Sequence, residues 1–81
     1  MIDYVLVTIC YKDKMMKDME LPAQLELPKV CEMLLETLQT AEPMLFSEVT
    51  SIKLKKNHKL VEIGTLFDNK VWDGSILEII S

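Results

Sequence analysis

The chain has 81 residues, of which 49% are hydrophobic and 27% are charged, with only 2 Gly and 3 Pro. This length and composition predict one compact domain over residues 1–81 with a small core, and they exclude a two-domain enzyme with an interdomain cleft. Nine lysines, no arginine and 13 acidic residues give a net charge of −4, which disfavours a phosphate backbone, so nucleic acid is not expected as the main partner.

The first predicted element is a strand over residues 2–10 (IDYVLVTIC), which is rich in β-branched side chains. Its alternation places Val5, Val7 and Ile9 on one face and Tyr4, Leu6 and Thr8 on the other. A polar turn at residues 12–14 precedes residues 17–21, where charged and apolar side chains alternate with period two. A β-hairpin that stops at Pro22 is therefore predicted.

An amphipathic helix is predicted over residues 28–41. Pro28 suits its first turn, where a missing N–H has no cost, and Pro43 prevents its continuation. Apolar residues recur at three- and four-residue spacing on one face: Val30, Cys31, Leu34, Leu35, Leu38 and Ala41. The opposite face carries Glu32, Glu36 and Gln39.

Three further strands are expected after a loop that contains Met44, Leu45 and Phe46. Residues 49–55 alternate, with Ile52 and Leu54 inward and Lys53 and Lys55 outward, and Asn57-His58 is a plausible turn into a short strand at residues 60–61. Gly64 begins a short capped turn, and the pair Asp73-Gly74 precedes a final strand over residues 75–80, which we expect to be central in the sheet.

The predicted order of elements is ββαβ(β)β. It corresponds to an α+β fold with a mixed sheet of four to five strands packed on one α-helix. Met19, Leu21, Leu77 and Ile79 are expected to join Val5, Val7, Ile52 and Leu54 on the side of the sheet that faces the helix.

Residues 60–79 contain a turn, a lone leucine, Thr65-Leu66, Val71, Asp73-Gly74-Ser75 and the closing strand 76–79. This pattern closely resembles the second half of ubiquitin-like β-grasp proteins, and the strand, hairpin and helix of the first half follow in the matching order. The chain is similar to the small ubiquitin-like accessory proteins of Gram-positive type VII (Esx) secretion systems, the YukD/EsaB group. The resemblance covers nearly the whole chain.

The resemblance implies an adaptor that binds a component of a type VII secretion machine, such as the cytosolic domain of a membrane pseudokinase or of a motor ATPase. We expect a monomer or a weak homodimer. Asp3 stands where a secretory signal would carry positive charge, and no apolar run approaches the roughly 18 residues of a spanning helix. We therefore expect a cytoplasmic protein, without direct membrane insertion, that its partner recruits to the inner face of the membrane.

No residue pattern indicates catalysis, a cofactor or a metal site. His58 is the only histidine and lies in a lysine-rich turn, and Asp68 and Asp73 are expected to cap turns. Cys10 and Cys31 lack metal-site spacing and are expected to be reduced thiols, with a disulfide between them as the alternative. The protein is therefore predicted not to be an enzyme.

Covalent conjugation and sulfur transfer are also disfavoured by the sequence. A ubiquitin-type modifier needs a flexible C-terminal Gly-Gly that can thread into its activating enzyme. This sequence reads Glu78-Ile79-Ile80-Ser81 at that place, within the predicted strand. A natural tail beyond Ser81 would restore the modifier as an alternative.

Tyr4, Leu6 and Ile80 are predicted to project from the open side of the sheet, flanked by Lys53 and Lys55. Ubiquitin-like folds usually bind partners there, although three scattered apolar residues need no function. Trp72 is a second candidate for partner binding, either as an exposed anchor or as a side chain folded over Val71 and Leu66.

Residues 53–59 form a basic tip. Four lysines and nine acidic residues precede residue 51, a net −5, whereas five lysines and four acidic residues follow it, a net +1. The tip would suit an acidic partner or anionic lipid headgroups, although such runs more often protect a hairpin end from aggregation. The alternative function is a regulator of expression that recognises RNA, through Lys53, Lys55, Lys56 and Lys59, or that recognises a protein that controls RNA.

Overall fold

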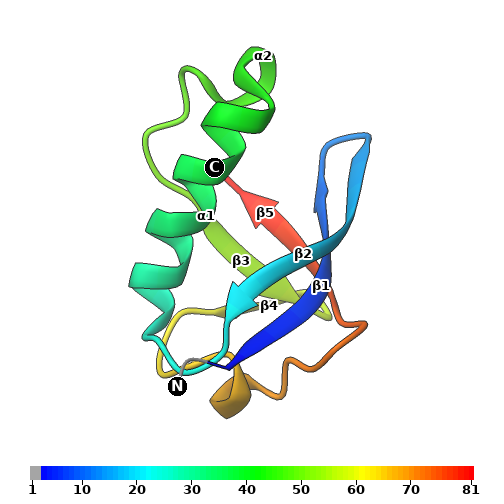
Figure 1. The fold of residues 1–81 in the computed structure, drawn as a ribbon, viewed down its shortest axis with the longest axis vertical. Helices are drawn as coiled ribbons and strands as arrows, with labels where there is room; N and C mark the ends of the chain where they lie inside the picture. The colour runs from blue at the N-terminus through cyan, green and yellow to red at the C-terminus, as the bar shows by residue number, and fades with distance from the viewer. Residues whose placement is uncertain (1–2) are drawn as a thin grey trace.

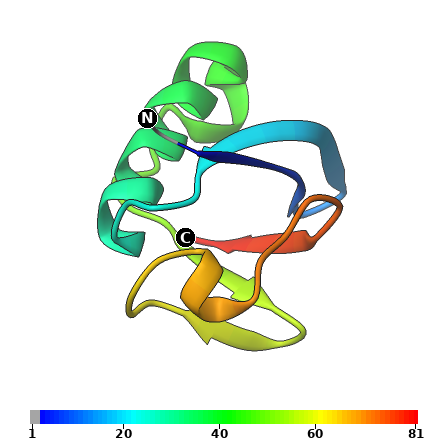
Figure 2. The same ribbon diagram turned by 60° about the horizontal axis from the view of Figure 1, so that its bottom comes forward.

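The computed structural model describes residues 3–81, which form one five-stranded sheet with a helix packed across one of its faces (Figures 1 and 2). In chain order the elements are β1 (Tyr4–Tyr11), β2 (Lys14–Pro22), α1 (Leu27–Ala41), α2 (Pro43–Phe46), β3 (Lys53–Lys56), β4 (Lys59–Val61), the 3₁₀ helix η1 (Phe67–Asn69) and β5 (Ile76–Ile80). Ile2, which the sequence assigns to the first strand, lies outside the described residues.

The sheet is mixed, with strand order β2-β1-β5-β3-β4. β5 pairs in parallel with β1 and antiparallel with β3. β1 also pairs with β2, and β3 pairs with β4, as two antiparallel hairpins. The prediction that the final strand is central is therefore confirmed. β5 joins the N-terminal and C-terminal hairpins into one sheet.

The core lies between α1 and the inner face of the sheet. Val30, Leu34, Leu35 and Leu38 of α1 are buried, as their helical spacing predicts. The sheet contributes Val5, Val7, Ile9, Leu21, Leu54, Leu77 and Ile79, and Ile52 is buried just before β3. The residues predicted on the inner face of the sheet are all buried except Met19, which is half-buried against this core.

A β-bulge interrupts the first hairpin. The pairing of β1 with β2 shifts between Val7, opposite Met19, and Ile9, opposite Met16. Asp18, within the bulge, has a φ of 57°. Strict alternation would place Met16 and Met19 on opposite faces of the sheet. The extra residue of the bulge puts both side chains on the inner face, where they are half-buried against the core.

Two predictions for α1 are wrong at its C-terminal end. Ala41 is exposed, whereas Gln39, assigned to the polar face, is half-buried. The cause is α2, which occupies the predicted loop and brings Phe46 into the core with its ring 4.6 Å from that of Tyr11. Gln39 Nε2 donates to the carbonyl oxygens of Phe46 at 3.3 Å and Val49 at 2.9 Å, so its side chain turns toward the segment after α2.

The strand predicted over residues 49–55 is also shorter than expected, because β3 begins at Lys53. Val49 instead belongs to the end of the α2 turn: its N–H donates to the carbonyl of Phe46 at 3.1 Å, and its own carbonyl accepts from Gln39. Residues 50–52 connect this turn to the strand.

The capped turn predicted at Gly64 is confirmed and leads into η1. The Thr65 N–H donates to Asp68 Oδ2 at 3.0 Å, and the Asp68 N–H donates to Thr65 Oγ1 at 3.1 Å. This reciprocal pair satisfies two backbone donors at the start of a helical turn. Gly64, with a φ of 81°, provides the left-handed residue that precedes it.

Candidate functional site

The open face of the sheet, on the side away from α1, carries the side chains that alternate with the core. On β1 these are Tyr4 and Leu6, which are exposed, and Thr8 and Cys10, which are half-buried. On β5 they are Ile76, Glu78 and Ile80. The apolar positions on this face are therefore the first place to look for a partner-binding surface.

Tyr4, Leu6 and Ile80 do not form one patch. Thr8 lies opposite Ile76 and Cys10 lies opposite Glu78, so Leu6 and Ile80 project from opposite ends of the parallel pair. Their separation along the strands is about 20 Å, since six residues of register at ~3.3 Å each divide them. Ile80 is half-buried and lies opposite Lys53, whereas Tyr4 and Leu6 are 52% and 43% exposed.

The loop before β5 places Trp72 next to the Leu6 end of the face. The Leu6 N–H donates to Asp73 Oδ1 at 2.9 Å, and the Leu6 carbonyl accepts from the Gly74 N–H at 2.8 Å. Ser75 closes the turn by accepting from the Trp72 N–H through Oγ and donating its own N–H to the Trp72 carbonyl. The position of Trp72 relative to β1 is thus set by four hydrogen bonds.

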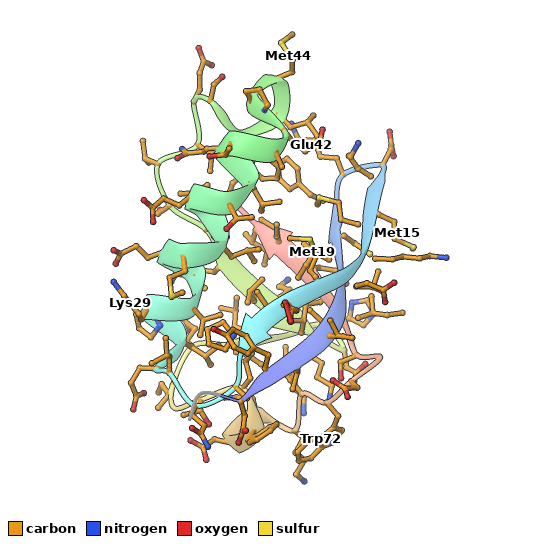
Figure 3. The ribbon with its side chains drawn as sticks, viewed as in Figure 1. Met15, Met19, Lys29, Glu42, Met44 and Trp72 are labelled. Carbon is orange, nitrogen blue, oxygen red and sulfur yellow. The ribbon has the colours of Figure 1, made fainter. Side chains whose placement is uncertain are left out.

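Trp72 is 54% exposed, so about half of its side chain is open to solvent (Figure 3). Its ring lies 5.7 Å from the ring of Phe67, which is also exposed. Val71 and Leu66, the two residues that Trp72 was predicted to cover in the alternative arrangement, are fully buried. We call the exposed side chains at this end of the open face the aromatic patch, which comprises Tyr4, Leu6, Phe67, Trp72 and Ile76.

Sequence reasoning missed two members of the aromatic patch. The outward position of Ile76 could have been predicted from the alternation of β5, because Leu77 and Ile79 point inward. Ile76 is 56% exposed. Phe67 gave no comparable signal, since its contact with Trp72 depends on how η1 packs against the following loop.

The predicted basic residues lie on the β3 side of the open face. Lys53 Nζ contacts Glu62 Oε1 at 2.8 Å, and the hydrogen bond and charge of Glu62 raise the pKa of Lys53. Lys55 is half-buried opposite Glu78, and Lys56 Nζ donates to the Lys70 carbonyl oxygen. Two lysines of the basic tip are therefore already engaged within the chain.

The residues considered for catalysis have other roles in the structure. Asp68 accepts from the Thr65 N–H in the turn before η1, Asp73 accepts from the Leu6 N–H of β1, and His58 is exposed in the β3–β4 turn with a φ of 67°. Cys10 and Cys31 are free thiols.

Within residues 3–81, no group of three or more histidine, cysteine or acidic side chains is arranged to hold a metal ion. No helix in the same residues is long and apolar enough to cross a membrane.

The fold and the open face can now be compared with known proteins. The family model described as "WXG100 protein secretion system (Wss), protein YukD" matches residues 4–79. The chain belongs to the YukD family. The family match covers β1 and all elements up to the buried part of β5, so it includes both hairpins, the helix and the aromatic patch.

A solved structure agrees with this fold. The ubiquitin-like domain of the Mycobacterium tuberculosis type VII secretion system protein EccD1 is similar with a TM-score of 0.75, and the match covers 98% of this chain and 99% of that one at 20% sequence identity. No curated protein matches the sequence. Membership of the YukD family and the ubiquitin-like fold together support an accessory role in a WXG100 secretion system, as the sequence resemblance implied.

Proposed function

We propose that this YukD-family protein is a non-catalytic adaptor that binds a protein component of the secretion machine through the aromatic patch. The observation that supports it is the exposure of Leu6 on β1 and of Trp72 on the adjacent turn, which hydrogen bonds of Asp73 and Gly74 join to Leu6. Rigid, exposed aromatic side chains are common anchors in protein interfaces, because they bury much area at little cost in conformational entropy.

The partner that we propose is the cytosolic domain of a membrane component, either a pseudokinase or a motor ATPase subunit. Binding to such a domain would bring a cytoplasmic protein to the inner face of the membrane without any insertion of its own. A single aromatic patch on a monomer suits one partner domain at a time.

Isothermal titration of the purified cytosolic domains tests this proposal. Trp72→Ala should weaken binding on the order of tenfold or more, because an interface anchor commonly contributes 2 kcal/mol or more. Met44→Ala is the matched control, since Met44 is 95% exposed and lies at the opposite end of the molecule (Figure 3). Equal binding by the wild type and Trp72→Ala, with unchanged circular dichroism, would overturn the aromatic patch as the docking surface.

A comparison of Leu6→Asp with Ile80→Asp separates the aromatic patch from the far end of the open face. Leu6→Asp should abolish binding, whereas Ile80→Asp should have a smaller effect, because Ile80 lies about 20 Å away along the strands. The reverse order would place the binding surface at the β3 side, next to Lys53.

We infer that the adaptor acts without covalent conjugation. The aromatic patch offers a surface for reversible binding, and β5 is held in the sheet, paired with β1 as far as Glu78 and with β3 as far as Ile80. Intact-mass analysis of the protein from its native cells checks this inference. A population joined through its terminal carboxyl to another molecule would contradict it.

Recognition of RNA has less support. The chain has a net charge of −4, and Lys53 and Lys56 of the basic tip are bonded to Glu62 and to the Lys70 carbonyl. A mobility-shift assay at physiological salt should therefore show no RNA binding.

A further inference from the structure

A second surface lies on the other side of the sheet, between α1 and the segment that leads into β3. It is a groove of about 730 Å³, with Leu27, Cys31 and Leu35 on the α1 side and Val49, Ile52 and Val61 on the opposite side. The exposed surface of its lining is mostly apolar. A volume in this range is large enough to hold several side chains of a ligand.

Cys31 marks this groove on α1. Its helical spacing predicts full burial with Val30 and Leu34, yet the thiol is only half-buried, because the groove opens beside it. Partial burial nevertheless raises the pKa of the Cys31 thiol above its ordinary value. The Cys31 thiol is therefore accessible from solvent within the groove, and its reactivity can report on whether the groove is occupied.

The segment opposite α1 has main-chain groups available. Among residues 3–81, the N–H and C=O groups of Thr50, Ser51 and Ile52 make no hydrogen bonds to other backbone groups, although Lys53 and the residues after it are paired on the sheet. These three residues line the groove. Unpaired main chain next to a strand is suited to adding a further extended segment, because its hydrogen bonds need no particular sequence in the ligand.

The charges at the groove are predominantly acidic. Glu32 and Glu36 line it from α1, and the third lining carboxylate, Glu62, is neutralised by Lys53 at 2.8 Å. Glu32 contacts Lys29 at 3.5 Å, but both side chains are more than half exposed, so this pair is weak. Glu36 has no ion-pair partner within the described part of the chain. Uncompensated negative charge therefore remains on the helical side of the groove.

We propose that this groove binds an extended, basic segment of a protein partner. Apolar side chains of that segment lie against Cys31 and Val49, the half-buried apolar residues of the lining. Its main chain pairs with residues 50–52, and its lysine or arginine side chains reach Glu32 and Glu36. The groove is a docking surface separate from the aromatic patch, on the opposite side of the sheet, so one molecule of this protein connects two partner segments.

The probe is an eight-residue peptide of alternating valine and lysine, with blocked ends. We expect it to slow the alkylation of Cys31 by iodoacetamide at least fivefold at saturation, read by mass spectrometry of the digested protein. Cys10 is the internal control, because it is half-buried on the open face and does not line the groove, so its alkylation rate should not change. Amide chemical shifts should change at residues 49–53 and along α1.

Two further peptides separate the contributions to binding. A peptide with glutamate in place of lysine should give no protection, because its charge repels Glu32 and Glu36. A peptide with the same side chains but N-methylated at alternate residues should bind at least tenfold more weakly, because it lacks the donors for main-chain pairing. Equal protection by all three peptides, or by none, would overturn the proposal.

The protein variants give an independent test. Glu32→Lys with Glu36→Lys should abolish protection by the basic peptide without unfolding the protein, because both residues are exposed. Trp72→Ala should leave protection unchanged, so failure of the aromatic patch and failure of the groove can be told apart. Protection that persists in the doubly charge-reversed variant would show that the acidic side of the groove does not select the ligand.

Discussion

At the scale of single residues, the two glycines serve different purposes. Both have positive φ, 81° at Gly64 and 88° at Gly74. A Cβ at Gly64 would lie 2.7 Å from Asp68 Oδ2, the atom that accepts from the Thr65 N–H, whereas nothing lies within 4 Å of a Cβ at Gly74. Gly64 is therefore required by both backbone conformation and space, and Gly74 by conformation alone.

Gly64→Ala should lower the free energy of unfolding by about 2 kcal/mol, roughly half from left-handed strain and half from loss of the cap between Thr65 and Asp68. Gly74→Ala, which adds only the strain, should cost about 1 kcal/mol. Urea denaturation of both variants measures the difference. Equal losses would mean that Asp68 moves aside without cost.

At the scale of elements, one side-chain amide of α1 joins it to the end of α2 and the segment that follows. Gln39 is half-buried and holds the carbonyls of Phe46 and Val49, and the Phe46 side chain completes the core beside Tyr11. Gln39→Glu keeps the shape of the side chain but removes the Nε2 donor. It should lower the free energy of unfolding by about 2 kcal/mol, because a carboxylate then faces two carbonyl oxygens.

Hydrogen exchange should locate this loss, with faster exchange at residues 43–49 and little change in β1. Thr40→Ala is the matched control on the next position of α1, because the Thr40 hydroxyl bonds only to Glu36 within the same helix. It should change stability by less than about 0.5 kcal/mol. A uniform increase in exchange in both variants would contradict a local role for Gln39.

At the scale of the whole molecule, β5 connects the two hairpins, so its inward side chains should affect every part of the fold. Leu77 is fully buried opposite Ile9. Leu77→Ala should therefore lower the free energy of unfolding by about 3 kcal/mol. Ile76→Ala, one residue earlier on the open face, should cost less than about 1 kcal/mol. Thermal unfolding should remain a single transition in both. Separate transitions for the two hairpins would show that β5 does not couple them.

Much of the fold was predictable because its signals are local. The alternation of Val5 and Val7 and the spacing of Leu34, Leu35 and Leu38 follow from the geometry of one strand or one helix. The burial of Phe46 and Gln39 was not predictable in this way, because both depend on how the chain turns back after Pro43. The bulge at Asp18 was missed for a similar reason: a single inserted residue changes which side chains point inward, and only the partner strand reveals it.

The candidate sites show the same division. Tyr4, Leu6 and Trp72 were identified from their residue type and position, but the pairing of Thr8 with Ile76 decided that Ile80 lies far from them and that Ile76 lies near. The groove beside Cys31 was not visible in the sequence at all. It depends on the space between α1 and residues 49–53, which are separated in the chain by α2.

The order of the five strands and α1, most of the amphipathic face of α1, the turns at Asn57-His58, Gly64 and Asp73-Gly74, and the ubiquitin-like family were determined by the sequence alone, because each depends on a run of neighbouring residues. The parallel register of β1 with β5, the return of α2 and the width of the groove were decided only by the tertiary structure. Each of these depends on two segments distant in the chain meeting at a particular offset, and no local pattern specifies that offset.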